Sequence, residues 1–257
     1  MTRRREPGLT RPGSPAGAPP GPGEPGPGPR PLVPARLRRT AVALLVVCVA
    51  VVTVLGALFA GQSRPDGFDA PIDAAFQSGL GAHPAVLEFL AGFGDPPLVT
   101  VMTVALVLGC AVARRWRGAA LATVAVPVAS GLTEGLLKPG IGRTHDGGLS
   151  YPSGHATTSF ALATVSIILL AAPSWPRVPA ITRRLLMLGA LLLAVAVPSA
   201  VVGLNGHYFT DIVGGAALGT GTAVLTALLL DIVCGSEWWR ARTARPGPEV
   251  PRPRGSS

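Results

Sequence analysis

The sequence is poor in charged residues, in aromatic side chains and in cysteine. Of its 257 residues, 14% are charged and 5% are aromatic. Soluble domains carry roughly 25% charged residues, and the mean hydropathy of +0.46 is high for such a domain. These values exclude an ordinary cytosolic domain. The aromatic residues are also too few for a stacking platform along single-stranded nucleic acid.

Acidic residues are scarce as well, with 13 Asp and Glu against 22 Lys and Arg and a formal charge of +9. Such a surplus fits either a nucleic-acid binder or a membrane protein with one basic face. The distribution favours the membrane protein, because 19 of the 22 basic residues would share one side of six alternating spans. Only Arg64, Lys138 and Arg143 would lie on the other side. We therefore expect contact with membrane lipids and no nucleic-acid partner.

The three cysteines, Cys48, Cys110 and Cys234, each fall in a different apolar run. This placement favours buried free thiols over a disulfide or a metal site. The chain also lacks the CxxC and HExxH patterns. We therefore expect no metal site and no cofactor.

Composition divides the chain into three parts. Residues 1–39 are rich in Pro and Gly, and residues 236–257 are rich in Arg and Pro. Neither segment can bury enough apolar surface to offset its ordering entropy, so we predict two disordered tails. A ligand role for SH3-type domains is the alternative reading of these tails. The part between them, residues 40–235, is the predicted membrane domain.

The membrane domain contains apolar runs of about the length that crosses roughly 30 Å of hydrocarbon. We therefore predict an all-α polytopic membrane protein with six transmembrane helices in a bundle. A cleaved signal peptide is the alternative for the first run, but the preceding segment is long for one. Residues 84–94 are too short to span and suit an interfacial helix. The six runs cover residues 40–60, 97–113, 118–137, 155–172, 185–204 and 212–234.

The asymmetry of basic residues predicts the orientation of the bundle. Loops rich in Lys and Arg stay in the cytoplasm, so both termini are expected to be cytoplasmic in a multi-pass cell-membrane protein. The opposite, extracytoplasmic side then holds all four histidines and Lys138, the only lysine in the chain. These residues fall in three clusters, LLKPGIGRTHDGG, SYPSGHATTSF and GLNGHYFTDIVGG.

The second cluster is typical of a helix start. Ser153 suits the N-cap position, and the free amides around Gly154 form an anion site. His155 would lie in the first turn, where it can donate or accept a proton. The alternative is a capped helix with an incidental histidine.

The third cluster places His207 and Asp211 four residues apart, on one face of a helix. A carboxylate that accepts one ring N–H leaves the other ring nitrogen free as a nucleophile or base. A purely structural His–Asp pair is the alternative.

The first cluster supplies positive charge. Turn-forming Pro139, Gly140 and Gly142 separate Lys138 from Arg143, so the two cations can converge on one oxyanion. Snorkelling at a helix end is the alternative for both. Their presence on the side that topology leaves poor in cations favours a functional role.

Together, in this order, the three clusters resemble the type 2 phosphatidic acid phosphatase family, which shares its core with vanadium haloperoxidases. The family pattern has Lys, six residues and Arg-Pro; then Pro-Ser-Gly-His; then Ser-Arg, five residues, His, three residues and Asp. The PSGH motif at 152–155 matches fully, His207 and Asp211 have the third motif's spacing, and Lys138 matches the first motif's opening. The resemblance covers about residues 40–235.

The chain departs from the family pattern at two places. His145 and Asp146 stand where the family has Arg-Pro, and Arg143 lies two positions earlier. Val201 stands where the third motif has Arg. Some family members use a shortened Lys–Arg spacing, so the resemblance assigns Arg143 to phosphate. His145 and Asn205 are possible auxiliary groups that would compensate for the lost Arg.

The resemblance implies a metal-independent mechanism at the extracytoplasmic end of the bundle. His207 would attack phosphorus to form a phosphohistidine, with Asp211 holding its ring, and His155 would protonate the leaving alkoxide and then activate water. Transition-state charge would be stabilised by Lys138, Arg143, Ser153 and Gly154. The expected activity is hydrolysis of a phosphoric monoester or diphosphate.

An active site at the membrane surface suits a lipid phosphate or polyprenyl pyrophosphate as substrate. The high Ala, Arg, Gly and Pro content and the single Lys indicate a GC-rich bacterial genome. They favour a cell-envelope carrier such as undecaprenyl phosphate or pyrophosphate.

Two other functions stay open. One is a non-catalytic protein on the same scaffold that binds a lipid headgroup or a partner, which the missing Arg favours. The other is a transporter, suggested by Glu134 within the third span, although an i,i+4 ion pair with Lys138 is the simpler account of that residue.

Overall fold

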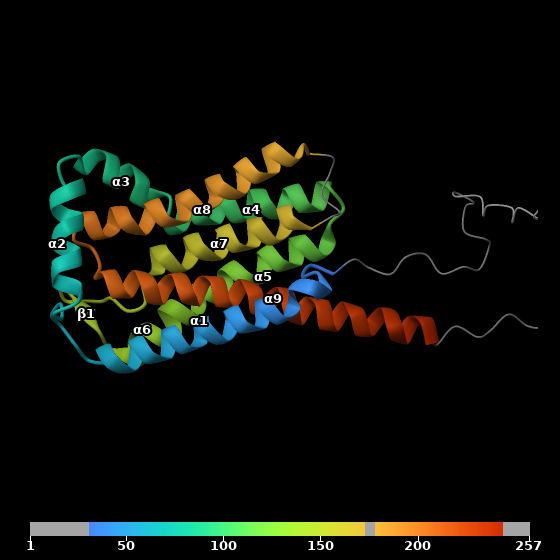
Figure 1. Cartoon of the computed structure of the whole chain (residues 1–257), viewed down its shortest axis with the longest axis horizontal. Helices are drawn as coiled ribbons and strands as arrows, with labels where there is room; N and C mark the ends of the chain where they lie inside the picture. Colours follow the sequence, from blue (N-terminus) through green and yellow to red (C-terminus); the bar gives the residue numbers. More distant parts are fainter. Residues whose placement is uncertain (1–30, 173–177, 244–257) are drawn as a thin grey trace, which may run out of the picture.

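The computed structural model describes residues 31–172 and 178–243. Its long helices lie side by side along one axis (Figure 1). After the 3₁₀ turn η1 (Ala35–Leu37), they are α1 (Arg38–Phe59), α4 (Pro96–Val112), α5 (Trp116–Leu132), α7 (Gly154–Ala171), α8 (Ala180–Gly203) and α9 (Phe209–Thr243).

The bundle is all-helical in character, as the apolar runs predicted. Among the described residues, five helices are long and apolar enough to cross a membrane. A sixth span results when the pair α3 (Pro84–Gly92) and α4, bent by 47° at a short break, counts as one. The helix α4 alone has 17 residues and corresponds to the predicted second span, residues 97–113.

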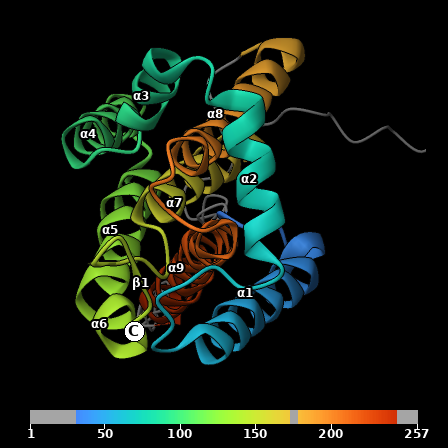
Figure 2. The ribbon, with the colours of Figure 1, turned by 90° about the vertical axis from the view of Figure 1, so that its left-hand side faces the viewer.

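The helix α7 lies at the centre of the bundle, between α5, α8 and α9 (Figure 2). The contact between α7 and α9 is close because glycines of α9 face α7. A Cβ atom at Gly219 would lie 2.1 Å from the Thr157 carbonyl oxygen, and one at Gly215 would lie 2.5 Å from the Ser153 carbonyl oxygen. The shared core of α5, α7 and α9 is filled by small and branched side chains, among them Leu121, Ala125, Val165 and Ala223.

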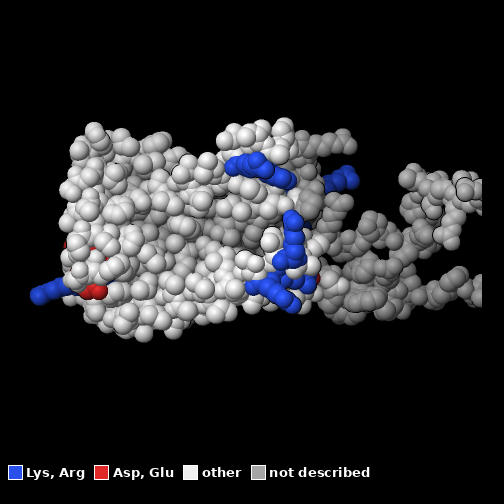
Figure 3. All heavy atoms as spheres, viewed as in Figure 1, with Lys and Arg blue, Asp and Glu red and all other residues white. Residues whose placement is uncertain are grey.

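The outer surface of the bundle is apolar, whereas charge gathers toward its ends. Side chains such as Val46, Val101, Leu192 and Ile232 are each at least 60% exposed. Lys and Arg are concentrated toward one end of the molecule, and the band between the two ends carries almost none (Figure 3). A soluble protein rarely exposes so large an apolar surface, so this distribution is the one expected of a protein surrounded by lipid.

At the basic end, Asp231 joins three segments. Its carboxylate accepts the Leu32 and Val33 N–H groups, both at 2.8 Å, and pairs with Arg117. This buried carboxylate is therefore satisfied, which explains an acidic residue near the end of an apolar helix. The three cysteines are free, as predicted, with Cys48 and Cys110 buried and Cys234 partly exposed.

The opposite end is capped by short elements, most of which lie outside the predicted apolar runs. The helix α2 (Asp69–Leu80) crosses this end (Figure 2). The π-helical turn η2 (Thr133–Leu137) and the short α6 (Lys138–Ile141) extend α5, and β1 (Thr144–His145) pairs with β2 (Gly148–Leu149). The predicted tail from 236 begins within α9, which continues to Thr243; residues 1–30 and 244–257 lie outside the described part.

Candidate active site

The PSGH motif forms the start of α7. Ser153 is the N-cap, and its hydroxyl accepts the Ala156 N–H at 3.4 Å. Gly154 and His155 occupy the first helical positions, where N–H groups have no intrahelical acceptor. The helix start predicted from the sequence is thus present, with His155 in its first turn.

His207 and Asp211 pair as their spacing predicted. The His207 Nδ1 lies 3.4 Å from the Asp211 Oδ2, which also accepts the Tyr208 N–H at 3.2 Å. With Nδ1 directed at the carboxylate, Nε2 is the nitrogen left for other contacts. The Ser153 N–H donates to the Asp211 carbonyl at 3.0 Å. The starts of α7 and α9, near which the two histidines lie, are therefore joined directly.

The second histidine also has a carboxylate partner, which sequence reasoning missed. The His155 Nε2 lies 3.2 Å from Oδ1 of Asp95, the N-cap residue of α4. Contact with Gly94 is close, since a Cβ atom there would lie 2.5 Å from the His155 Cδ2. No motif signals Asp95, because the α3–α4 break brings it to His155 from 60 residues away.

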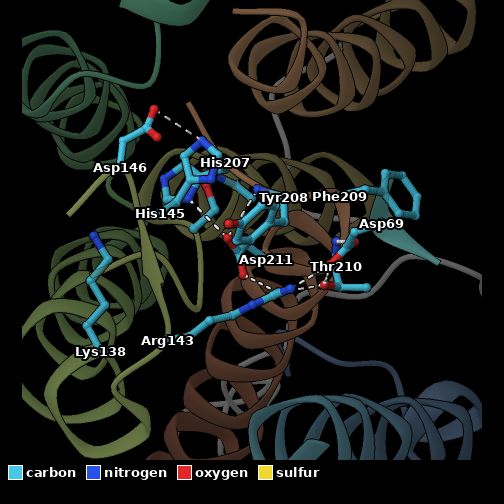
Figure 4. Close-up of polar contacts among 12 residues, drawn as sticks. Asp69, Lys138, Arg143, His145, Asp146, His207, Tyr208, Phe209, Thr210 and Asp211 are labelled. Carbon is cyan, nitrogen blue, oxygen red and sulfur yellow. Dashed lines mark hydrogen bonds and ion pairs between the residues drawn. The ribbon is translucent and has the colours of Figure 1, made fainter. Parts of the chain in front are cut away.

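Arg143 does not face the same space as Lys138. Its Nη1 donates to the Asp211 Oδ1 at 2.7 Å, its Nη2 donates to the Asp69 Oδ2 at 2.6 Å, and its side chain is fully buried. Figure 4 shows the guanidinium directed at Asp211 and away from Lys138. The resemblance assigned Arg143 to phosphate binding. In the structure, Arg143 instead pairs with the Asp211 carboxylate, which in turn pairs with the His207 ring.

The cluster around Arg143 is closed by aromatic rings and by α2. Its guanidinium carbon lies 4.2 Å from the Phe59 ring centroid and 4.4 Å from that of Tyr208. Burial raises the pKa of the Tyr208 hydroxyl, an effect that nearby Arg143 partly opposes. Asp69 accepts hydrogen bonds from the Thr210 N–H at 2.9 Å and from the Thr210 hydroxyl at 2.8 Å. The cluster therefore fixes the start of α9, which carries Asp211.

A further carboxylate of α2, Asp73, supports the same segment. It accepts the Phe209 N–H at 3.0 Å. Burial raises the pKa of Asp73 to about 6, although this hydrogen bond opposes the shift. Neither Asp69 nor Asp73 was predicted from the sequence, because the segment that carries them is neither a span nor a recognisable motif. The available signal was two acidic residues four positions apart in a segment between two predicted spans.

Lys138 forms the ion pair with Glu134 that the i,i+4 spacing predicted. Its Nζ lies 2.8 Å from the Glu134 Oε1 and 3.0 Å from the Oε2. Both side chains lie against α7, since a Cβ atom at Gly154 would be 2.8 Å from the Glu134 Oε1 and 4.0 Å from the Lys138 Nζ. Of the two predicted phosphate-binding cations, Lys138 is the one that lies beside Gly154 at the start of α7.

The remaining predicted residues are engaged elsewhere. Ser153 is fully buried and caps α7. The His145 Nε2 lies 2.8 Å from the Asn205 carbonyl oxygen, and the His145 ring packs edge-on against Tyr208. The Asn205 side chain accepts a hydrogen bond from Gln77 at 3.0 Å. None of these three side chains lines the cavity described next, and neither does Arg143.

A cavity of about 900 Å³ contains both histidines in its wall. One end is polar, with Glu134, Lys138, Gly154, His155 and His207. The rest is formed mainly by α4 and α5, and the α4 residues that line it run from Pro96 to Leu108. This is about 18 Å of helix at 1.5 Å per residue. A second cavity, of about 310 Å³ between α4, α7 and α8, has no ionisable side chain in its wall.

A family model described as PAP2 superfamily matches residues 39–232. The chain belongs to the PAP2 superfamily. Comparison with curated proteins finds no match, and comparison with solved structures finds none. Membership confirms the resemblance seen in the sequence and indicates phosphatase activity on phosphorylated lipids in a membrane.

Within this PAP2 chain, the two departures from the family pattern both bear on the charge of the cavity. Val201, at the position of the third motif's Arg, is a buried residue of α8. Arg143 is turned inward to Asp69 and Asp211. Among the residues that line the cavity, all in the described part of the chain, Lys138 alone carries a permanent positive charge.

Proposed function

We propose that this protein is an integral membrane phosphatase that hydrolyses a lipid phosphate or polyprenyl (pyro)phosphate without a metal. One observation carries the proposal: His155, His207 and Lys138 line the polar end of a single cavity whose other walls are largely apolar. A phosphate group and an apolar chain of the same substrate can therefore be bound together.

The His207–Asp211 pair supports a nucleophilic role for His207. Because Nδ1 is directed at Asp211, Nε2 attacks phosphorus, and the P–N bond forms as the bond to the leaving oxygen breaks. Asp211 stabilises the positive ring of the phosphohistidine, and the ion pair to Arg143 holds Asp211 in place. Arg143 thus acts through Asp211 as a positioning residue.

His155 is placed to serve as general acid and then as general base. It donates a proton to the alkoxide that leaves phosphorus in the first step. In the second step it takes a proton from water, whose oxygen bonds to phosphorus while the P–N bond breaks and inorganic phosphate forms. The Asp95 carboxylate, 3.2 Å from Nε2, orients the ring.

Charge on the transferred phosphoryl group is stabilised by Lys138 and by the N-terminal end of α7. The first-turn amides at Gly154 and His155 are free to donate, and the helix dipole favours an anion there. This arrangement requires no metal ion. With a single cation in the wall, the helix end carries a larger share of this stabilisation.

The apolar part of the cavity suits one lipid chain. The hydroxyls of Thr100, Thr103 and Thr123 donate to carbonyls of their own helices. These threonines therefore present mainly methyl groups, and a chain along α4 meets few polar groups that lack a partner. A bacterial polyprenyl carrier remains the candidate that composition favours.

We place this site on the extracytoplasmic side and both termini in the cytoplasm. The proposal is supported by the basic residues, which gather toward the end of the molecule opposite α2 and the histidines (Figures 1 and 3). Positively charged segments stay in the cytoplasm during membrane insertion.

A second candidate is a protein that binds a lipid headgroup without turnover. It is favoured by Val201 at the position of the third motif's Arg and by the inward orientation of Arg143. Turnover separates the two candidates.

The test is phosphate release by the detergent-purified protein in EDTA. The substrates are phosphatidic acid, phosphatidylglycerophosphate and a polyprenyl pyrophosphate, and His207→Ala is assayed alongside. We expect release from at least one lipid and a loss of at least a thousandfold in the variant. Headgroup binding without release would support the second candidate, and equal release by the variant would refute the assigned nucleophile.

A further inference from the structure

The Glu134 carboxylate lies where an anion is best stabilised in the cavity. Both of its oxygens are within 3.0 Å of the Lys138 Nζ. It also lies against Gly154, the first residue of α7. Free amides and the positive end of the helix dipole meet at this position.

The substrate phosphate needs these same two partners. Lys138 is the one permanent cation among the lining residues of the described chain. When its ammonium pairs with Glu134, the polar end of the cavity carries no net charge from these two residues. A phosphate that reaches Lys138 must displace the carboxylate or bear its repulsion.

Glu134 is able to move away. Its side chain is 55% exposed, whereas that of Lys138 is 15% exposed. It belongs to η2, the π-helical turn that Thr133 ties to α7 through a 3.2 Å hydrogen bond to Thr157. The backbone is therefore held while the carboxylate can swing toward the open side of the cavity.

We propose that Glu134 is an internal competitor for phosphate: its carboxylate occupies Lys138 and the α7 end, and weakens phosphate binding there. The inference rests on the proposed phosphatase site. Its consequence is easier release of the inorganic phosphate product, because the carboxylate recaptures Lys138 as the product leaves. Glu134 thereby contributes to the balance between binding and turnover without touching the reacting atoms.

The opposite reading makes a prediction of opposite sign. If Glu134 only orients Lys138 for phosphate, removing its charge weakens phosphate binding. Substitution by Gln distinguishes the two, because the amide oxygen still accepts a hydrogen bond from Lys138 while the negative charge is lost.

The experiment measures binding of inorganic phosphate to the detergent-purified full chain by calorimetry, together with inhibition of lipid hydrolysis by phosphate. Glu134→Gln is compared with the wild type and with Glu88→Gln, which alters an exposed glutamate of α3 outside the cavity. We expect Glu134→Gln to lower the dissociation constant about tenfold, since a like charge beside the anion is removed. Glu88→Gln should leave it unchanged.

Unchanged or weaker phosphate binding in Glu134→Gln would overturn the inference, as would equal tightening in Glu88→Gln or the absence of phosphate binding in every variant. A different result would refute the proposed function. Phosphate binding that tightens in Glu134→Gln without turnover of any lipid would refute the phosphatase and leave the competitor role standing.

Discussion

At the scale of the residue, the burial of Arg143 between Asp69 and Asp211 leads to a test. Arg143→Ala leaves Asp69 and Asp211 buried without their cation. Removal of one partner of a buried ion pair costs about 3–5 kcal/mol. We expect thermal unfolding in detergent to show a loss of this size, together with loss of phosphate release. The control is Arg64→Ala, an exposed arginine at the same end of the bundle.

A different result would restore the role that the sequence suggested for Arg143. If Arg143→Ala unfolds like the wild type but binds inorganic phosphate much more weakly, then Arg143 contacts the phosphate. That outcome would contradict its assignment as a positioning residue.

Asp73 gives a prediction about pH. Its pKa is raised to about 6 by burial, so the folded protein binds the proton more tightly than the unfolded chain does. The stabilisation that results is present at low pH and is lost as the pH rises through about 6. Asp73→Asn keeps an acceptor for the Phe209 N–H. The difference in melting temperature, Asp73→Asn minus wild type, should therefore be larger at pH 7 than at pH 5.

The control for this prediction is Asp146→Asn, which alters an exposed carboxyl near the same site. Its melting temperature should follow that of the wild type at both pH values. An Asp73→Asn difference that is the same at pH 5 and pH 7 would contradict the assigned titration.

At the scale of single residues, the sequence predicts contacts within a motif but not contacts between segments that are far apart in the chain. Spacing predicted the Glu134–Lys138 pair, because residues four apart on a helix meet. The predicted His207–Asp211 pair also forms, although His207 precedes α9, which begins at Phe209. The partners Asp95 of His155 and Asp69 of Arg143 come from 60 and 74 residues away. Only the three-dimensional packing brings them together, and the same packing turns Arg143 inward.

At the scale of the helix, the contact between α7 and α9 depends on the absence of side chains. A Cβ atom at Gly219 would lie 2.1 Å from the Thr157 carbonyl oxygen, a backbone atom that cannot move independently. We expect Gly219→Ala to lower the free energy of unfolding by about 1–3 kcal/mol. Because α7 and α9 carry His155 and Asp211, phosphate release should fall as well.

The matched control is Gly189→Ala in α8, where a Cβ atom would meet nothing within 4 Å. Alanine is the better helix former by about 1 kcal/mol, so this variant should be as stable as the wild type or more stable. Equal destabilisation of the two variants, measured by thermal unfolding in detergent, would contradict the close α7–α9 contact.

Apolar length predicted the long helices but not the elements at the histidine end of the bundle. Helix α2 carries Asp69, Asp73 and Pro71 within 12 residues, so it has neither the length nor the hydropathy of a span. Its helical form depends on tertiary packing, including the contacts of Phe76 and Phe68 with Phe209. Such long-range support is not visible in a local pattern.

At the scale of the whole molecule, the proposed topology is testable by chemical labelling. In a background with Cys48, Cys110 and Cys234 replaced by alanine, the exposed residues Arg64 and Arg184 are each changed to cysteine. A membrane-impermeant maleimide should label Arg64→Cys in intact cells and Arg184→Cys only after permeabilisation. Labelling of both from outside, or the reverse pattern, would contradict the extracytoplasmic position of the site.

The central claim is that His207 carries the phosphoryl group during turnover. The most direct measurement is trapping of the intermediate by a rapid quench in alkaline detergent, with a ³²P-labelled lipid phosphate that the purified protein hydrolyses. We predict protein-bound label that is stable in alkali and lost in acid, located on His207 and absent from His207→Ala. Hydrolysis without protein-bound label, or label that persists in His207→Ala, would contradict the account.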